Sequence, residues 1–303
     1  MGRSLILVTG APRTATTPVG NMLASARKTV SLYEPLGPTG MRRFQTWFPM
    51  AGDPGAQQLG TLVEDLRDLR MRGLKSQQRG GVFSVKRAFL GSRTLHSYRV
   101  ARLRIGAEHL IWKDPHAIFL AADIAKQGVP VVLTIRQARA HAASYLRLGW
   151  VSRAGELYPR WRDRFGRCDI IERFLPDAGE AVTSAALLWR MCYLPFLQQG
   201  VLDHVHLVTP DALMQDERAC YAELFGKLGL EQSARTRAML QAPRSDAGNR
   251  PSRGTTHDWG RSVAAVNTYW REILTADDLA RIHTITGDIE GPILTSMPGT
   301  EPH

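Results

Sequence analysis

Residues 4–17 constrain the fold of this chain more than any other stretch. Residues 5–8 form a continuous apolar run, which is typical of a buried strand in a parallel sheet. Gly10 and Pro12 interrupt that strand, and apolar side chains then recur at helical spacing from Val19 to Ala26. A strand, a short loop and a helix in this order direct free N–H groups and the positive end of the helix dipole toward an anion. The stretch therefore predicts an α/β fold with a phosphate-type site near its start.

The side chains of the loop favour the same ligand. Arg13 carries a planar guanidinium that matches phosphate or sulfate oxygens, and Thr14, Thr16 and Thr17 add hydroxyl donors. The usual P-loop pattern is G-x-x-x-x-G-K-[ST], and no Gly-Lys-Ser/Thr follows Gly10. The loop is therefore predicted to bind an anion in a different way from a nucleoside triphosphatase.

Strand and helix patterns alternate along the chain. Further strands are predicted at residues 30–33, 82–85, 109–112, 129–135 and 204–208. The helical patterns between and after them include residues 59–73, 117–126, 138–148, 221–228 and 277–286. This alternation predicts one α/β domain over residues 1–303, with a central parallel sheet flanked by helices and right-handed crossovers. Ligands of such sheets bind beyond the carboxyl ends of the strands. The polar residues at predicted strand ends are Arg13, Glu34, Lys86, Lys113 and Arg136.

Three segments outside the predicted sheet are expected to cover the site. Residues 36–58 contain Trp47 and Phe48, and residues 150–175 combine aromatic side chains with several arginines. We expect both segments to act as a lid or insertion. Residues 242–262 are rich in Pro, Gly, Ser and Arg and are expected to form a long loop over the site.

Composition narrows the function class. The 39 Lys and Arg residues exceed the 28 Asp and Glu residues, and the resulting formal charge of +11 favours anionic ligands. The three cysteines are widely spaced and form no C-x-x-C pattern, which argues against a disulfide framework or a zinc site. The apolar run of residues 5–8 is too short for a signal peptide or a membrane span. We therefore expect a cytoplasmic protein without membrane insertion.

The loop sequence Pro12-Arg13-Thr14-Ala15-Thr16-Thr17 resembles the 5′-phosphosulfate loop of sulfotransferases that depend on 3′-phosphoadenosine 5′-phosphosulfate (PAPS). The family pattern is close to Pro-(Lys/Arg)-(Ser/Thr)-Gly-Thr-Thr. Ala15 stands where the family usually has Gly, and an alanine there is expected to require a negative φ. The resemblance implies a P-loop NTPase-like sulfotransferase fold. It also implies that the cofactor contacts Ala11, Pro12, Arg13, Thr14, Ala15, Thr16 and Thr17.

Two later motifs extend this resemblance over most of the chain. Arg136 and Ser144, eight residues apart, are similar to the pair with which the family binds the 3′-phosphate, although Gln137-Ala138 replaces the usual Asp-Pro. Residues 253–259 resemble the family's Lys-Gly-x-x-Gly-Asp-Trp loop, with Arg253 in place of the Lys. The resemblance therefore implies that Arg253 and Gly254 contact the 3′-phosphate as well.

The resemblance implies direct in-line transfer of the sulfuryl group from PAPS to a hydroxyl, leaving adenosine 3′,5′-bisphosphate (PAP), with no metal required. Arg13 is expected to neutralise charge on the transferred group. Glu34 is the first candidate for the base that takes the acceptor proton, and His116 is the second. Lys113 is expected to stabilise the bridging oxygen of the leaving group. The acceptor is expected to be a small molecule or to contain a carbohydrate, with residues 36–58 and 150–175 as the lid or insertion on its side. Residues 242–262 are expected to cover the cofactor. The sequence determines neither the identity of the acceptor nor the oligomeric state.

Two other functions compete with this interpretation. A nucleotide-dependent kinase or phosphotransferase would need a Lys in the Walker position and an acid that binds Mg²⁺. A basic polyanion-binding protein would explain the net charge. However, the arginines are spread along the chain and no nucleic-acid-binding signature is present, so no nucleic acid partner is expected.

Overall fold

The computed structural model describes residues 2–75, 92–242 and 262–295. Contacts within the chain divide it into two compact units. Unit 1 contains Met1–Thr134, His204–His206 and Tyr221–Gln241, and unit 2 contains Ile135–Asp203, Leu207–Cys220 and Ala242–His303. The expectation of one domain over the whole chain stays a prediction.

The sheet confirms the predicted fold class. Its strands are β1 (Ser4–Thr9), β2 (Thr29–Tyr33), β3 (His109–Lys113), β4 (Val131–Thr134) and β5 (His206–Val208), in the order β2-β3-β1-β4-β5. β1 pairs in parallel with β3 and β4, and β2 pairs in parallel with β3. After β1, the chain forms β2 and β3 on one side of that strand and then β4 and β5 on its other side. The carboxyl end of β1 is thus the position at which sheets of this type bind ligands.

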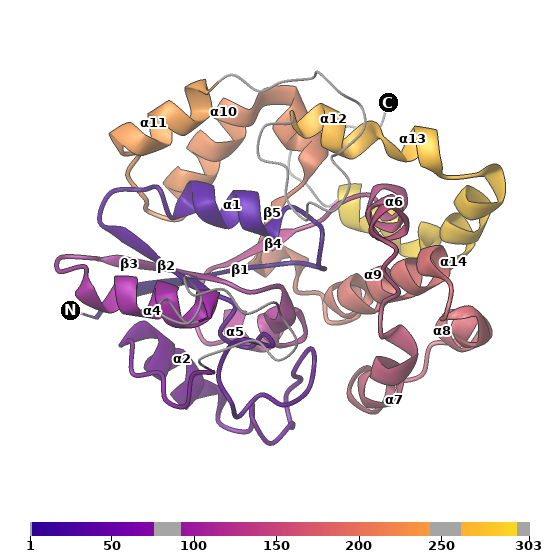
Figure 1. Ribbon diagram of the computed structural model, residues 1–303, viewed down its shortest axis with the longest axis horizontal. Coiled ribbons are helices and arrows are strands. Elements are labelled where there is room, and N and C mark those ends of the chain that lie inside the picture. The colour runs from indigo at the N-terminus through magenta and orange to yellow at the C-terminus, as the bar shows by residue number, and fades with distance from the viewer. Residues whose placement is uncertain (1, 76–91, 243–261, 296–303) are drawn as a thin grey trace. The chain divides into compact units, whose positions relative to one another are not determined.

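Helices cover both faces of the sheet in unit 1. In Figure 1, α1 (Thr16–Leu23) and α11 (Ala234–Gln241) lie on one face, and α2 (Leu59–Arg67), α4 (Arg93–Leu103) and α5 (Ala121–Ala125) lie on the other. Ile6, Leu7 and Val8 are fully buried between these layers. This burial on two faces explains why β1 is a continuous apolar run and not an alternating one.

Unit 2 is built around the helix α9 (Ala181–Gln198), which packs against α6 (Ala138–Leu148), α7 (Ala154–Phe165), α8 (Asp169–Phe174) and α14 (Ala276–Thr295). α9 is buried on all sides, as its apolar sequence requires. Its one buried charge is Arg190, which donates hydrogen bonds of 2.5 and 2.8 Å to the two carboxylate oxygens of Asp288. These hydrogen bonds lower the pKa of Asp288. The remaining helices in the part of the chain that the structure describes are η1 (Pro115–Leu120), η2 (Leu175–Asp177), η3 (Leu202–His204), α10 (Pro210–Lys227), α12 (Val263–Thr268) and α13 (Trp270–Ile273).

Several predicted boundaries are wrong for identifiable reasons. The helix expected to reach about residue 73 ends at Arg67, because Leu69 adopts a left-handed φ of 54°. The helix expected at residues 117–126 begins instead as the 3-10 helix η1, with Pro115 at its first position. The final helix continues past the expected residue 286 to Thr295, and Pro292 lies inside it. The expected strand at residues 82–85 and residues 243–261 of the expected long loop lie outside the described residues.

Two chemical expectations can be compared with the structure. The three cysteines are free, and burial raises the pKa of the Cys192 thiol. Among the described residues, no helix combines the length and the hydropathy that a membrane span needs.

Candidate active site

The loop between β1 and α1 turns tightly against β4. A Cβ atom on Gly10 would lie 2.3 Å from both the carbonyl oxygen and the hydroxyl of Thr134, so only glycine fits there. Arg13 and Ala15 both have left-handed backbones, with φ of 76° and 68°. Such conformations are costly for residues with a side chain and persist only where the surrounding structure enforces them. The path of the loop is therefore strongly constrained.

Threonine hydroxyls anchor this loop to β4. The Thr14 hydroxyl donates to the Ala11 carbonyl over 2.7 Å and lies 3.1 Å from the Thr134 hydroxyl. The Thr16 hydroxyl also lies 3.1 Å from that of Thr134. Thr14 and Thr16 are both buried. Both hydroxyls thus hold the loop in place, and the expectation that they donate to a phosphate stays a prediction.

The N-terminus of α1 is suited to an anion. Ala15 occupies the N-cap position and makes no side-chain cap, and the first turn contains no acidic residue. The first N–H groups of any helix have no acceptor within the helix, and they carry the positive end of its dipole. Arg13 and Thr17 are half-buried beside these groups in the chain. The loop thus fits a phosphate or sulfate group.

The conformation of Ala15 contradicts the expectation of a negative φ. Its φ of 68° lies in the left-handed region, so the alanine is strained at the position where the resembling family has glycine. The alanine therefore adds strain to the loop.

Replacing Ala15 with glycine is expected to stabilise the protein by about 0.5–1 kcal/mol. Relief of left-handed strain contributes about 1–2 kcal/mol, and the greater freedom of glycine in the unfolded chain offsets part of it. The matched control is Ala24→Gly at the other end of α1, where φ is −68° and glycine brings no relief. Urea unfolding of the three proteins measures the effect, and a less stable Ala15→Gly variant would show that the alanine is not strained.

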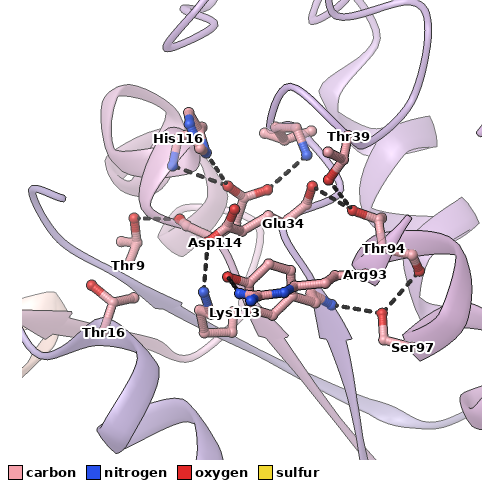
Figure 2. Close-up of polar contacts among 12 residues, drawn as sticks. Thr9, Thr16, Glu34, Thr39, Arg93, Thr94, Ser97, Lys113, Asp114 and His116 are labelled. Atoms are coloured by element: carbon pink, nitrogen blue, oxygen red, sulfur yellow. Dashed lines mark hydrogen bonds and ion pairs between the residues drawn. The ribbon is translucent and has the colours of Figure 1, made fainter. Parts of the chain in front are cut away.

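Glu34 and Lys113 form an ion pair at the carboxyl ends of β2 and β3. Tyr33 and Lys113 are in register on these paired strands, and Glu34 follows Tyr33 directly. The Lys113 Nζ lies 2.6 Å from the Glu34 Oε1 and 3.8 Å from the centre of the Tyr33 ring. The side chain of Lys113 is only 4% exposed and that of Glu34 is 18% exposed. Figure 2 shows both predicted residues next to Asp114 and His116.

The pair lies against the first helix and the first strand. A Cβ atom on Gly20 of α1 would approach the Cγ of Lys113 to 2.6 Å, so the lysine stem packs directly on the helix backbone. The Thr9 hydroxyl, at the end of β1, donates to the carbonyl of Asp114 over 2.8 Å. The strand and the helix that flank the candidate anion-binding loop therefore also position the ion pair.

Asp114 fixes the orientation of His116. Asp114 is fully buried, and its Oδ1 lies 3.0 Å from the backbone nitrogen of His116 and 3.2 Å from Nδ1 of the same residue. Its Oδ2 accepts a 2.7 Å hydrogen bond from the backbone nitrogen of Leu36. When Nδ1 donates to this carboxylate, Nε2 is the nitrogen that can accept a proton. Sequence reasoning missed Asp114, although an Asp before Pro115 at a helix start was a readable N-cap signal.

Aromatic side chains from residues 36–58 lie against His116. The ring centres of Trp47 and Phe48 are 5.5 and 5.4 Å from that of His116. Gly37 separates His116 from Glu34, because a Cβ there would lie 3.1 Å from the His116 Nδ1 and 3.2 Å from the Glu34 Cβ. Trp47 is 47% exposed and Phe48 is buried. This segment therefore forms an aromatic wall beside His116.

The predicted 3′-phosphate residues Arg136 and Ser144 are buried in unit 2. Arg136 donates from Nε to the Oδ1 of Asn267 over 3.2 Å and from Nη2 to the carbonyl of Val266. The Arg136 carbonyl accepts a 2.7 Å hydrogen bond from the Trp189 indole. Burial lowers the pKa of the Arg136 guanidinium. Ser144 lies on α6, and the other candidates, Arg253, Gly254 and Lys86, lie outside the described residues.

Comparisons with known proteins add little to this picture. Neither a scan against protein-family models nor a search of curated proteins finds a match. Among solved structures, the chain is similar to the sulfotransferase domain from the Synechococcus PCC 7002 olefin synthase, with 14% identity and a TM-score of 0.43. The similarity covers 93% of this chain and 94% of that chain.

Proposed function

We propose that this protein is a PAPS-dependent sulfotransferase that transfers a sulfuryl group to the hydroxyl of a small-molecule or carbohydrate-containing acceptor. The observation that carries the proposal is the Glu34–Lys113 ion pair of 2.6 Å, at the ends of two strands beside the anion-binding loop. An acid–base pair next to an anion site suits a reaction that removes a hydroxyl proton and stabilises an anionic leaving group. The loop motif supports the choice of a phosphosulfate ligand.

PAPS supplies an activated sulfuryl group, whose bond to the 5′-phosphate breaks as a bond to the acceptor oxygen forms. Arg13, the backbone N–H groups of the loop and Thr17 would hold the phosphosulfate. Arg136 and Ser144 would hold the 3′-phosphate, together with Arg253 and Gly254. Bonding of a phosphate by a guanidinium and by a helix N-terminus is strong because each hydrogen bond involves an ion.

Glu34 would take the acceptor proton, and Lys113 would donate a hydrogen bond to the oxygen that leaves with the 5′-phosphate. The two roles are compatible in space, because the ion pair places a proton acceptor and a hydrogen-bond donor 2.6 Å apart. His116 is the alternative base. Its Nδ1 lies 3.2 Å from the Asp114 carboxylate, so Nε2 is the nitrogen that can accept a proton. Trp47 and Phe48 would line the acceptor side.

A thermal-shift experiment tests the cofactor assignment. PAP at about 100 times its Kd is expected to stabilise the protein by about 2.7 kcal/mol, and ATP with Mg²⁺ is expected to have little effect. Arg136→Ala is expected to remove most of the PAP shift. The matched control is Arg139→Ala, an exposed arginine on the neighbouring helix α6, which should retain the shift.

The competing functions give different results in the same experiment. Stabilisation by ATP with Mg²⁺ alone would favour a kinase or phosphotransferase. Stabilisation by neither nucleotide, together with salt-dependent binding of heparin or DNA, would favour a polyanion-binding protein. Either result would contradict the sulfotransferase proposal.

A further inference from the structure

Arg136 is the first member of a chain of side-chain hydrogen bonds in unit 2. Its Nε donates to the Oδ1 of Asn267 over 3.2 Å, and the Nδ2 of Asn267 donates to the Oδ1 of Asp211 over 2.9 Å. The other carboxylate oxygen of Asp211 accepts a 3.2 Å hydrogen bond from the Gln137 side chain. Asn267 lies on α12 and Asp211 lies on α10. Segments that are far apart in the sequence thus meet at the guanidinium.

The two neighbours of Asn267 determine which way its amide points. A guanidinium can only donate and an ionised carboxylate can only accept, so the amide oxygen faces Arg136 and the amide nitrogen faces Asp211. Asn267 is 3% exposed, so water does not replace either partner easily. Asparagine is therefore well suited to this position. Aspartate would set a second carboxylate against Asp211, and leucine would leave both neighbours without this partner.

The acceptors that Asn267 and Val266 give to Arg136 are neutral. They orient the guanidinium, and Asp211 lies near enough to interact with its charge. Because the guanidinium is buried, little solvent screens its attraction for a phosphate dianion.

We propose that Asn267 is a positioning residue for the 3′-phosphate of the nucleotide: it orients Arg136 through its amide oxygen, and Asp211 holds the amide in place. This inference rests on the proposed function, in which Arg136 binds that phosphate. Asn267 acts through Arg136 and is not assigned a contact with the nucleotide.

Calorimetric titration with two ligands tests the inference. PAP carries the 3′-phosphate and 5′-AMP lacks it, so the ratio of their affinities isolates the effect at that group. Asn267→Asp is expected to weaken PAP at least 30-fold and to change 5′-AMP by less than twofold. The matched control is Thr268→Ala, the exposed neighbour of Asn267 on α12, which should bind both ligands as the wild type does.

A double-mutant cycle shows whether Asn267 acts through Arg136. Asn267→Leu is expected to weaken PAP about 10-fold in the wild-type background and less than twofold when Arg136→Met is already present. If Asn267→Asp does not fold, Asp211→Asn tests the same hydrogen-bond chain with a smaller change. It is expected to weaken PAP about threefold and to leave the affinity for 5′-AMP unchanged.

The possible failures are distinguishable. Three results would overturn the positioning role and leave the proposed function standing. The Asn267 variants could lose equal affinity for PAP and for 5′-AMP, Asn267→Leu could cost the same affinity in both backgrounds of the cycle, or both Asn267 variants could bind PAP as the wild type does. A wild-type protein that binds PAP no better than 5′-AMP would contradict the proposed function itself, and the inference would fall with it.

Discussion

Replacing Glu34 with glutamine is expected to lower kcat for sulfuryl transfer by about 10²–10⁴-fold, the usual contribution of a positioned general base. Glutamine keeps the size of the side chain and an oxygen that accepts from Lys113, which lies 2.6 Å from the carboxylate. It removes the basicity that takes the acceptor proton. The Kd for PAP is expected to change by less than twofold, because the loop residues that we propose to hold the nucleotide are untouched.

The measurement is release of PAP from PAPS in the presence of a panel of phenols and sugars. Glu64→Gln, an exposed glutamate on α2, is the matched control and should retain full activity. His116→Gln decides between the two candidate bases. Full activity in Glu34→Gln combined with a large loss in His116→Gln would assign the base to His116 and would contradict the role given to Glu34.

Sequence reasoning predicted the parts of the fold that depend on local pattern. Burial between two helix layers requires the continuous apolar run of residues 5–8, so β1 could be read directly. The bounds of α6 agree with the sequence because Gly149, in a left-handed conformation, ends the helix. The first half of α10 was missed although the sequence signals it. Pro210 opens that helix, and the Thr209 hydroxyl accepts from the backbone nitrogen of Ala212 over 3.1 Å.

The same distinction holds for the candidate site. Glu34 and Lys113 could be placed together because each ends a predicted parallel strand, and the carboxyl ends of such strands share one edge. The role of the Thr14 hydroxyl could not be predicted, because it depends on Thr134, which is 120 residues away in the sequence. The partner of Arg136 is 131 residues away, on a short helix whose packing no local pattern reveals. Local patterns place residues such as Arg136 near the ends of strands, but they do not identify the distant residues to which these side chains are hydrogen-bonded.

Replacing Trp189 with alanine is expected to lower the free energy of unfolding by about 3–5 kcal/mol, the usual cost of truncating a large buried aromatic residue. Trp189 is fully buried on α9, and its ring centre lies 4.8 Å from that of Tyr193. Its indole nitrogen also donates to the carbonyl of Arg136 over 2.7 Å. The residue therefore supports the core of unit 2 and the backbone of a candidate phosphate ligand at the same time.

Trp189→Phe separates these two contributions. Phenylalanine keeps most of the apolar contact and removes the donor, which leaves the buried carbonyl of Arg136 without this hydrogen bond at a cost of about 1–3 kcal/mol. We therefore expect Trp189→Phe to fold and to unfold at a lower urea concentration than the wild type. Its affinity for PAP is expected to fall more than its affinity for 5′-AMP. Trp150→Ala is the control, because that side chain is 39% exposed and should contribute less to stability. If Trp189→Phe matched the wild type in both urea midpoint and PAP affinity, the indole hydrogen bond would have no part in holding Arg136. The support that α9 gives to the site would then come from packing alone.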